Sequence, residues 1–214
     1  MSEERFDIIT EADARRLPVG GAVVLNRGGH VTPLAADTLR ERRIRVTRIE
    51  GAPPVDAETL VPVADIRRVT IGSDHTGVAL KGRLIEALRR RGCAVDDAGT
   101  TDATSVDYPD IAARVARAVA RGEADAGIVI DGAGLGSAMA ANKIPGIRAA
   151  MCPTETLARY ARQHNGANVL ALGATLLTFE EALRIVETWM CTPMTEGRYI
   201  QRLAKIRALE RSDR

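Results

Sequence analysis

Short apolar runs alternate with longer segments of helical period from Val69 towards the end of the chain. The runs that predict strands, because they are short and rich in aliphatic and β-branched residues, are 69–73, 93–97, 127–131, 147–151 and 168–172. Apolar residues recur at helical spacing within 80–88, 111–119, 179–191 and 197–210. This alternation predicts the α/β class with a doubly wound sheet of five parallel strands. We therefore expect functional residues directly after the strands, where such sheets bind ligands.

The first 66 residues do not continue this rhythm. Pro53-Pro54 and Pro62 punctuate their end as a linker would, so the pattern predicts a small α+β unit over 1–66 and a larger domain over 67–214. Within the small unit we expect strands over 22–26 and 44–49 and a helix from Thr32-Pro33 to Arg42. A unit of this size is marginal alone, and we expect it to dock on the larger domain or on a partner, or to stabilise an oligomer.

Composition narrows the function classes. The formal charge is +2 and aromatic residues make up 3%, which argues against a nucleic-acid partner. No apolar run is long enough to cross a bilayer and the N-terminus lacks a secretory signal, so we expect a cytoplasmic protein that contacts no membrane. Cys93, Cys152 and Cys191 form no CxxC pair, so we expect three small buried residues and no zinc site.

Two predicted strand ends carry chemical groups. Asp74 and His75 follow the first strand, although Asp74 or Thr76 could equally cap the next helix. Asp131 ends the third strand and is followed by a loop and a predicted helix, whose start could bind an anion or oxyanion. The loop glycines are Gly132, Gly134 and Gly136. The loop lacks the GxGxxG spacing and the GK[ST] ending, so it indicates neither a dinucleotide nor ATP.

Two further clusters are weaker when judged alone. His164 and Asn165 precede the fifth strand, and His164 could be an acid or base near neutral pH or an ordinary structural histidine. Arg198 and Arg202 are four residues apart on the last predicted helix and share a face suited to phosphate oxygens. The basic residues are nearly all arginines, so such a pair is also expected by chance.

Taken in order, these segments resemble the type B ribose-5-phosphate isomerase and galactose-6-phosphate isomerase family. The resemblance covers about residues 68–210 and rests on SDHTG, SVDYPD, GIVIDGAGLGSAMAANKIPGIRAAMC, ARQHNGANVLALG and EGRYIQR. It implies a Rossmann-like sheet, no metal or organic cofactor, and a dimer or tetramer with sites between subunits. It also implies aldose–ketose isomerisation of a pentose, tetrose or hexose phosphate through a cis-enediolate.

The resemblance also implies roles for individual residues. His164 would open the sugar ring, with Asp74 and Tyr108 near the sugar oxygens and Asn165 hydrogen-bonded to the substrate. The N–H groups of Gly132 to Gly136 would hold the oxyanion. The phosphate ligands would be His75, Arg198 and Arg202, some of them reaching the neighbouring subunit's site.

The sequence departs from the family pattern at the base. Typical ribose-phosphate enzymes have cysteine in place of Asp131 and a hydroxyl residue in place of Ala133; a glutamate base known in others is Ser137 here, and a familiar histidine is Tyr199. Asp131 resembles instead the aspartate of the A-type subunit of heteromeric galactose-6-phosphate isomerase. Two hypotheses follow: Asp131 is the base, its pKa raised towards neutrality by burial, or the chain only binds sugar phosphates, alone or as the A-type subunit of a mixed oligomer.

Residues 8–50 resemble a short segment of accessory enzymes in ethanolamine-type bacterial microcompartments, through the string from Thr32 to Leu39 and RERRIRV after it. This implies docking to a microcompartment or to a paralogous partner through residues 1–66. An ordinary oligomer-stabilising extension explains the segment as well.

Overall fold

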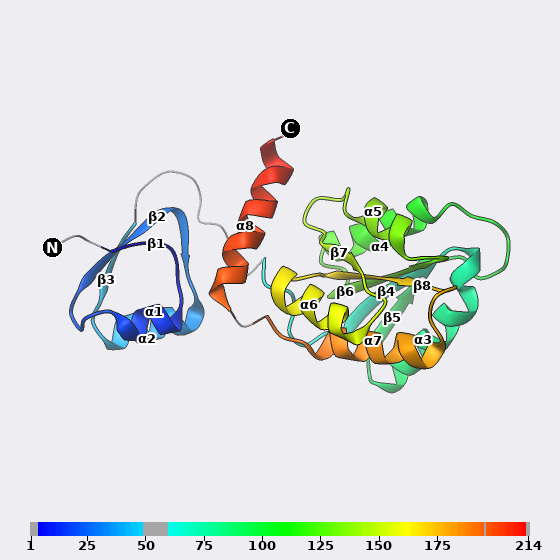
Figure 1. Cartoon of the computed structure of the whole chain (residues 1–214), viewed down its shortest axis with the longest axis horizontal. Helices are drawn as coiled ribbons and strands as arrows, with labels where there is room; N and C mark the ends of the chain where they lie inside the picture. Colours follow the sequence, from blue (N-terminus) through cyan, green and yellow to red (C-terminus); the bar gives the residue numbers. More distant parts are fainter. Residues whose placement is uncertain (1–3, 49–59, 195, 213–214) are drawn as a thin grey trace. The chain divides into compact units, whose positions relative to one another are not determined.

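The computed structural model describes residues 4–48, 60–194 and 196–212. The predicted Pro53-Pro54 linker and the last residue of the strand expected over 44–49 lie outside these ranges. The chain forms two compact units, one of residues 62–194 and one of residues 1–61 with 195–214 (Figure 1). The sequence pattern assigns the last helix to the larger domain, whereas its contacts in the structure group it with the N-terminal residues.

The larger unit is an open parallel sheet covered by helices on both faces (Figure 1). Its five strands, in the order β5-β4-β6-β8-β7, are β4 (Arg68–Ser73), β5 (Ala94–Asp97), β6 (Ala126–Asp131), β7 (Ala149–Met151) and β8 (Val169–Gly173). Its helices are the 3₁₀ turn η1 (His75–Gly77), α3 (Val78–Arg90), α4 (Tyr108–Ala120), α5 (Leu135–Ala141), α6 (Glu155–Asn165) and α7 (Phe179–Cys191). The doubly wound five-stranded sheet is therefore confirmed, and every strand that the pattern predicts is present.

Two hydrophobic cores hold the helices of the larger unit to the sheet. On one face, side chains of α3 and α7 such as Leu84 and Trp189 pack with the sheet residues Ile71 and Ile128. On the other face, α4 and α5 contribute Val115 and small alanines against residues of β6 and β8. The helical residues that face the sheet are those at the apolar phase of the sequence pattern, so burial of that stripe holds the helices to the sheet.

The smaller unit has its own sheet and its own core. Its elements are β1 (Arg5–Ile9), α1 (Glu11–Arg16), β2 (Ala22–Val31), α2 (Pro33–Glu41), β3 (Arg45–Arg48) and α8 (Gly197–Ser212). The strands pair in parallel in the order β1-β2-β3, and Ile9, Leu25 and Leu39 lie in the core. Thr32 caps α2 by accepting a hydrogen bond from the Ala35 N–H, with Pro33 at the first helical turn, as the sequence predicts.

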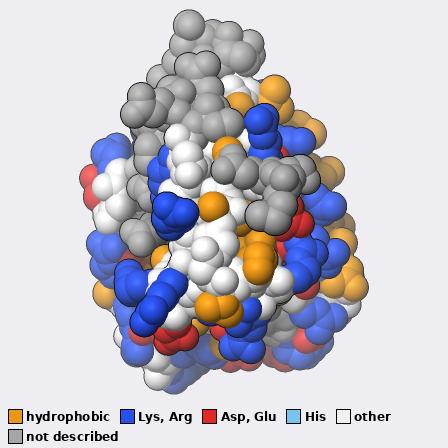
Figure 2. Space-filling model, turned by 90° about the vertical axis from the view of Figure 1, so that its left-hand side faces the viewer, with side chains coloured by type: hydrophobic (Ala, Val, Ile, Leu, Met, Phe, Trp, Pro, Cys, Tyr) orange, Lys and Arg blue, Asp and Glu red, His pale blue; other side chains and the backbone are white. Residues whose placement is uncertain are grey.

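Basic side chains are spread over the surface. On the face drawn in Figure 2, Lys and Arg side chains lie among apolar, uncharged and, less often, acidic ones. None of the described helices has the length and apolar character of a membrane-spanning segment.

Candidate functional site

The carboxyl ends of β4 and β6 bring the first two predicted loops together. Ser73 at the end of β4 pairs with Ile130, and the Asp74 N–H donates to the Ile130 carbonyl at 3.1 Å. Asp74 and Asp131 therefore lie on adjacent strand ends, at the sheet edge where we expected ligand groups. Both side chains are buried, with exposed fractions of 6% and 5%.

The Asp131 carboxylate binds the backbone of the glycine loop. Its Oδ1 accepts hydrogen bonds from the N–H groups of Ala133, at 2.9 Å, and of Gly134. Its Oδ2 accepts from the Ser137 N–H at 2.8 Å. Gly134 has a φ of 77°, and a Cβ there would lie 2.9 Å from the Leu172 carbonyl carbon, so the loop needs glycine at this position.

These contacts reverse the expected effect of burial on the pKa of Asp131. Burial alone raises that pKa, but the Ser137 hydroxyl and the N–H groups of Ser137, Gly134 and Ala133 stabilise the ionised form and bring the pKa below its usual range. The expectation of a pKa near neutrality is therefore wrong. The N–H groups of Ala133 and Gly134, expected to hold an oxyanion of the substrate, donate to Asp131 instead.

The lowered pKa of Asp131 predicts an acid-sensitive contribution to stability. A carboxyl group with a lower pKa in the folded than in the unfolded chain stabilises the fold above its unfolded pKa, and this stability is lost as the pH falls through the folded pKa. We expect Asp131→Asn to lower the free energy of unfolding by about 1–3 kcal/mol at pH 7 and by progressively less towards pH 3. Urea unfolding at a series of pH values measures this, and a difference that does not change with pH would contradict it.

Asp74 and His75 occupy the turn that follows β4. Asp74 accepts hydrogen bonds from the Thr76 N–H at 2.9 Å and from the Thr76 hydroxyl at 2.6 Å. Asp74 therefore caps the turn that follows β4, which is one of the two roles that the sequence leaves open for it. His75 is half-buried, and its Nδ1 accepts from the Val106 N–H at 3.5 Å.

Tyr108 lies over the glycine loop. It is 40% exposed at the start of α4, and a Cβ added to Gly136 would lie 2.5 Å from the Cζ of its ring. Gly136 therefore provides the space that the phenol occupies. Tyr108 and Asp131 thus meet at one loop, although they are far apart in sequence.

A buried lysine holds the loop that leads to Tyr108, and sequence reasoning missed it. Lys81 is 2% exposed, and its Nζ donates to the Thr100 carbonyl and to the Asp97 Oδ2, each at 2.7 Å. A signal was available, because Lys81 stands in the same helical phase as the apolar residues Leu84, Ile85 and Leu88.

His164 and Asn165 lie at the amino-terminal ends of the strands, opposite the carboxyl ends that carry Asp74 and Asp131. They end α6, directly before β8, and β8 pairs Val169 with Gly127 at the start of β6 and Gly173 with Asp131 at its end. A rise of ~3.3 Å for each of four strand residues separates the amino and carboxyl ends of the strands by about 13 Å. One copy of the larger unit therefore does not bring His164 and Asn165 to Asp131.

Arg198 and Arg202 lie on α8 in the other compact unit. Both guanidinium groups lie against the Tyr199 ring, 4.9 and 5.7 Å from its centre, so they share the helix face that their spacing predicts. Arg198 also pairs with the Glu196 carboxylate at 2.6 Å.

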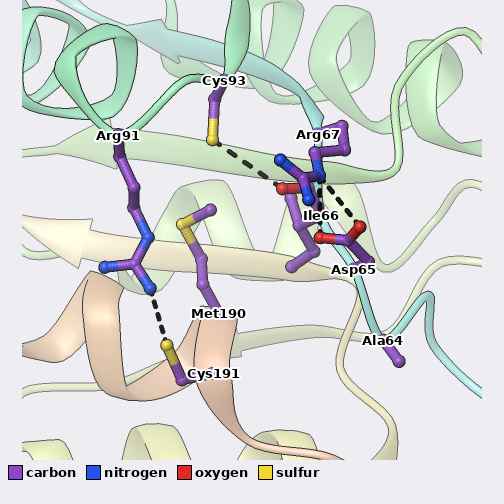
Figure 3. Close-up of a pocket in the computed structure, with 8 residues that line it drawn as sticks. All are labelled: Ala64, Asp65, Ile66, Arg67, Arg91, Cys93, Met190 and Cys191. Carbon is purple, nitrogen blue, oxygen red and sulfur yellow. Dashed lines mark hydrogen bonds and ion pairs between the residues drawn. The ribbon is translucent and has the colours of Figure 1, made fainter.

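A separate pocket of about 290 Å³ opens at the amino-terminal edge of the sheet (Figure 3). Its lining includes Arg91, Cys93 and Cys191, none of which belongs to the expected site. Cys93 and Cys152 are buried as expected, but Cys191 is exposed and its sulfur accepts a hydrogen bond from Arg91 at 2.7 Å, so that expectation is wrong for Cys191. The reason is its place at the C-terminal end of α7, where the helix leaves the core.

Known proteins share the larger unit with this chain. The family model described as Ribose/Galactose Isomerase matches residues 69–206, well over half of the chain. This chain belongs to that family. Ribose-5-phosphate isomerase B of Escherichia coli (strain K12) is 43% identical over 145 residues, which are 68% of this chain and 97% of that protein.

Solved structures of family members show the same fold. Ribose-5-phosphate isomerase B of Clostridium thermocellum matches with a TM-score of 0.68 and 48% identity, covering 69% of this chain and 99% of that one. The enzyme of Mycoplasma genitalium, solved with bound ribulose-5-phosphate, matches with a TM-score of 0.65 and 39% identity, covering 67% and 96% of the two chains. The match to the family model includes most of α8, although α8 lies with the N-terminal residues in this structure.

Proposed function

We propose that this chain is an aldose–ketose isomerase of a sugar phosphate that works through a cis-enediolate. The observation that carries the proposal is the convergence of Asp74, His75, Tyr108 and Asp131 on one sheet edge in a chain of the Ribose/Galactose Isomerase family. Relatives that are named for ribose 5-phosphate, one of them solved with ribulose-5-phosphate, make a pentose phosphate the first substrate to test.

In this proposal Asp131 is the base that moves the proton between adjacent sugar carbons. Its lowered pKa keeps it ionised at neutral pH, which is the form that accepts a proton. As the proton reaches the carboxylate, the negative charge moves to the sugar oxygen. The loop N–H groups can then donate hydrogen bonds to that oxygen. The same donors stabilise the carboxylate before the reaction, however, so their net contribution to catalysis is small.

A complete site then requires two copies of the chain. His164 opens the ring of a sugar that Asp131 deprotonates, yet the two residues lie at opposite edges of one sheet. A second copy that presents its amino-terminal edge to the carboxyl edge of the first would join them, with Asn165 beside His164. Exposed apolar side chains that such a pair can bury lie near both parts of the site. Leu135, Met139 and Leu176 belong to the segments that follow β6 and β8, and Tyr160 stacks on His164. His75, Arg198 and Arg202 would bind the phosphate.

A second candidate function is binding of a sugar phosphate without turnover, alone or as the A-type subunit of a mixed oligomer. The observation in its favour is the Asp131 carboxylate, whose two oxygens already accept three backbone hydrogen bonds. A carboxylate so well satisfied gains little by accepting a proton.

Assays of the purified chain separate the two functions. We expect it to interconvert at least one of ribose 5-phosphate, erythrulose 4-phosphate and galactose 6-phosphate. Binding of one of them, weakened by Arg198→Ala and accompanied by no turnover, would support the second function instead. Recovery of activity only after addition of a cysteine-bearing paralogue would identify the mixed oligomer.

For residues 1–66 we propose docking, either to a neighbouring copy or to a partner such as a microcompartment component. The support is that the smaller unit has a hydrophobic core of its own, which includes Ile9, Leu25 and Leu39. A unit with its own core is suited to present a defined surface.

A further inference from the structure

A buried arginine in the larger unit donates its hydrogen bonds to backbone carbonyl groups. Arg162 of α6 is 1% exposed, and within the part of the chain that the structure describes its guanidinium donates to the Ala167 and Val63 carbonyls and to no carboxylate. Its guanidinium lies 4.9 Å from the centre of the Trp189 ring, and its Nε has no hydrogen-bond partner among the described residues. Burial, together with the charge of Arg148, lowers the pKa of Arg162 to about 10.

A charge buried in this way is costly, by several kcal/mol before compensation. An apolar side chain of similar volume would fill the space between α6 and α7 without that cost. Arginine differs from such an apolar side chain in its directed N–H donors. The groups that accept hydrogen bonds from these donors therefore indicate the role of Arg162.

The first acceptor closes the turn that carries His164. Arg162 Nη1 donates to the Ala167 carbonyl at 2.8 Å, across the residues that include His164. The backbone of the same turn is fixed by hydrogen bonds from the Gly166 N–H to the Arg162 carbonyl and from the Ala167 N–H to the Ala161 carbonyl, at 3.1 and 2.9 Å. The His164 ring stacks on Tyr160, with the ring centres 4.8 Å apart.

The second acceptor lies in the segment that leads into β4. Arg162 Nη2 donates a short hydrogen bond to the Val63 carbonyl. Val63 stands at the start of the larger unit, one residue after Pro62. One guanidinium therefore joins the entry segment of this unit to the turn of His164.

We propose that Arg162 is a positioning residue for His164, which it orients by holding the Ala167 and Val63 carbonyls at the same time. The consequence for turnover rests on the proposed function, because there His164 opens the sugar ring. The consequence for the orientation of the ring does not rest on it.

NMR of the histidine rings in the full chain tests the orientation directly. The chain has three histidines, so His30, His75 and His164 give three assignable ring signals. In Arg162→Met, which removes both donors but keeps much of the volume, we expect the His164 signal to shift and broaden while the other two stay in place. Arg117→Met, the same change at an exposed position of α4, should move none of them.

Turnover of two substrate classes separates positioning from a general loss of structure. A tetrose 4-phosphate cannot close a furanose ring because its O4 carries the phosphate, so it needs no ring opening. We expect Arg162→Met to lower kcat about tenfold to a hundredfold for a cyclising sugar phosphate and to leave the tetrose 4-phosphate unaffected. An equal loss for both classes would overturn the proposal.

The NMR measurement also decides the matter if no sugar phosphate reacts, since it needs no activity. A His164 signal that stays in place in a folded Arg162→Met variant would overturn the proposal. If that variant does not fold, Arg162→Lys replaces it, because lysine keeps the charge but reaches only one of the two carbonyls. An intermediate shift of the His164 signal is then expected, and an unchanged signal would again contradict the proposal.

Discussion

Asp131→Asn lowers turnover by a factor on the order of 10² to 10⁴, because the amide cannot take the proton that the proposed base accepts. Asp131→Cys is expected to have the opposite effect on ribose 5-phosphate and to raise kcat at least about tenfold. The thiolate that accepts the proton is a weaker hydrogen-bond acceptor than a carboxylate, and it becomes a neutral thiol as the proton arrives. The N–H groups of Ala133 and Gly134 can then donate to the substrate oxygen, and each hydrogen bond to a charged group is worth about 1.5–3 kcal/mol. Steady-state kinetics of the three proteins measures both effects.

Asp125→Asn is the matched control for these variants. Asp125 lies at the other end of β6 and, like Asp131, accepts backbone N–H bonds, from Arg67 and Arg68 at 2.9 and 2.8 Å. Its loss should therefore affect stability in a similar way and leave kcat unchanged. Normal turnover in Asp131→Asn, or a loss of turnover in Asp125→Asn as large as that in Asp131→Asn, would exclude Asp131 as the base.

Two inactive variants are expected to restore activity when they share an oligomer. Asp131→Asn damages one half-site and His164→Ala the other, so each variant alone has no intact site. In a mixed dimer one of the two sites takes both its Asp131 and its His164 from undamaged halves. Refolding the two together at equal amounts should yield about a quarter of the wild-type activity, since half of the dimers are mixed.

The control for complementation is a pair of variants at the same edge. Asp131→Asn and Asp74→Asn damage the same half-site, so every site in their mixed dimer carries one damaged residue and no activity should return. Equal recovery in both pairs, or no recovery in either, would contradict a site shared between two copies.

The main elements of the larger unit could be predicted because their apolar periods are strong. Residues 179–191 form a helix over the predicted range, and the strand predicted over 127–131 begins one residue earlier as β6. Helix α6 was missed because its buried residues are alanines and Arg162, which give no apolar stripe. In the smaller unit, β1 and the six-residue helix α1 were too short for a periodic signal.

The site was less predictable, for two physical reasons. The pKa of Asp131 depends on how many N–H groups reach its carboxylate, and a sequence indicates burial but not the number of donors. The position of His164, by contrast, can be predicted from the sequence. A residue that precedes a parallel strand lies at the amino end of that strand, so His164 lies at the end of the sheet opposite to Asp131. The same rule for strand ends places Asp74 and Asp131 together at the carboxyl ends of β4 and β6.

Exchange of the sugar-bound hydrogen with solvent tests the central claim most directly. The claim is that an ionised carboxylate at the end of β6 removes a proton from a sugar phosphate. Incubation of ribose 5-phosphate, erythrulose 4-phosphate and galactose 6-phosphate with the chain in deuterium oxide should then place deuterium at C1 or C2 of at least one of these sugars. Asp131→Asn should abolish this incorporation. The absence of deuterium from all three sugars, or undiminished incorporation by Asp131→Asn, would contradict the claim.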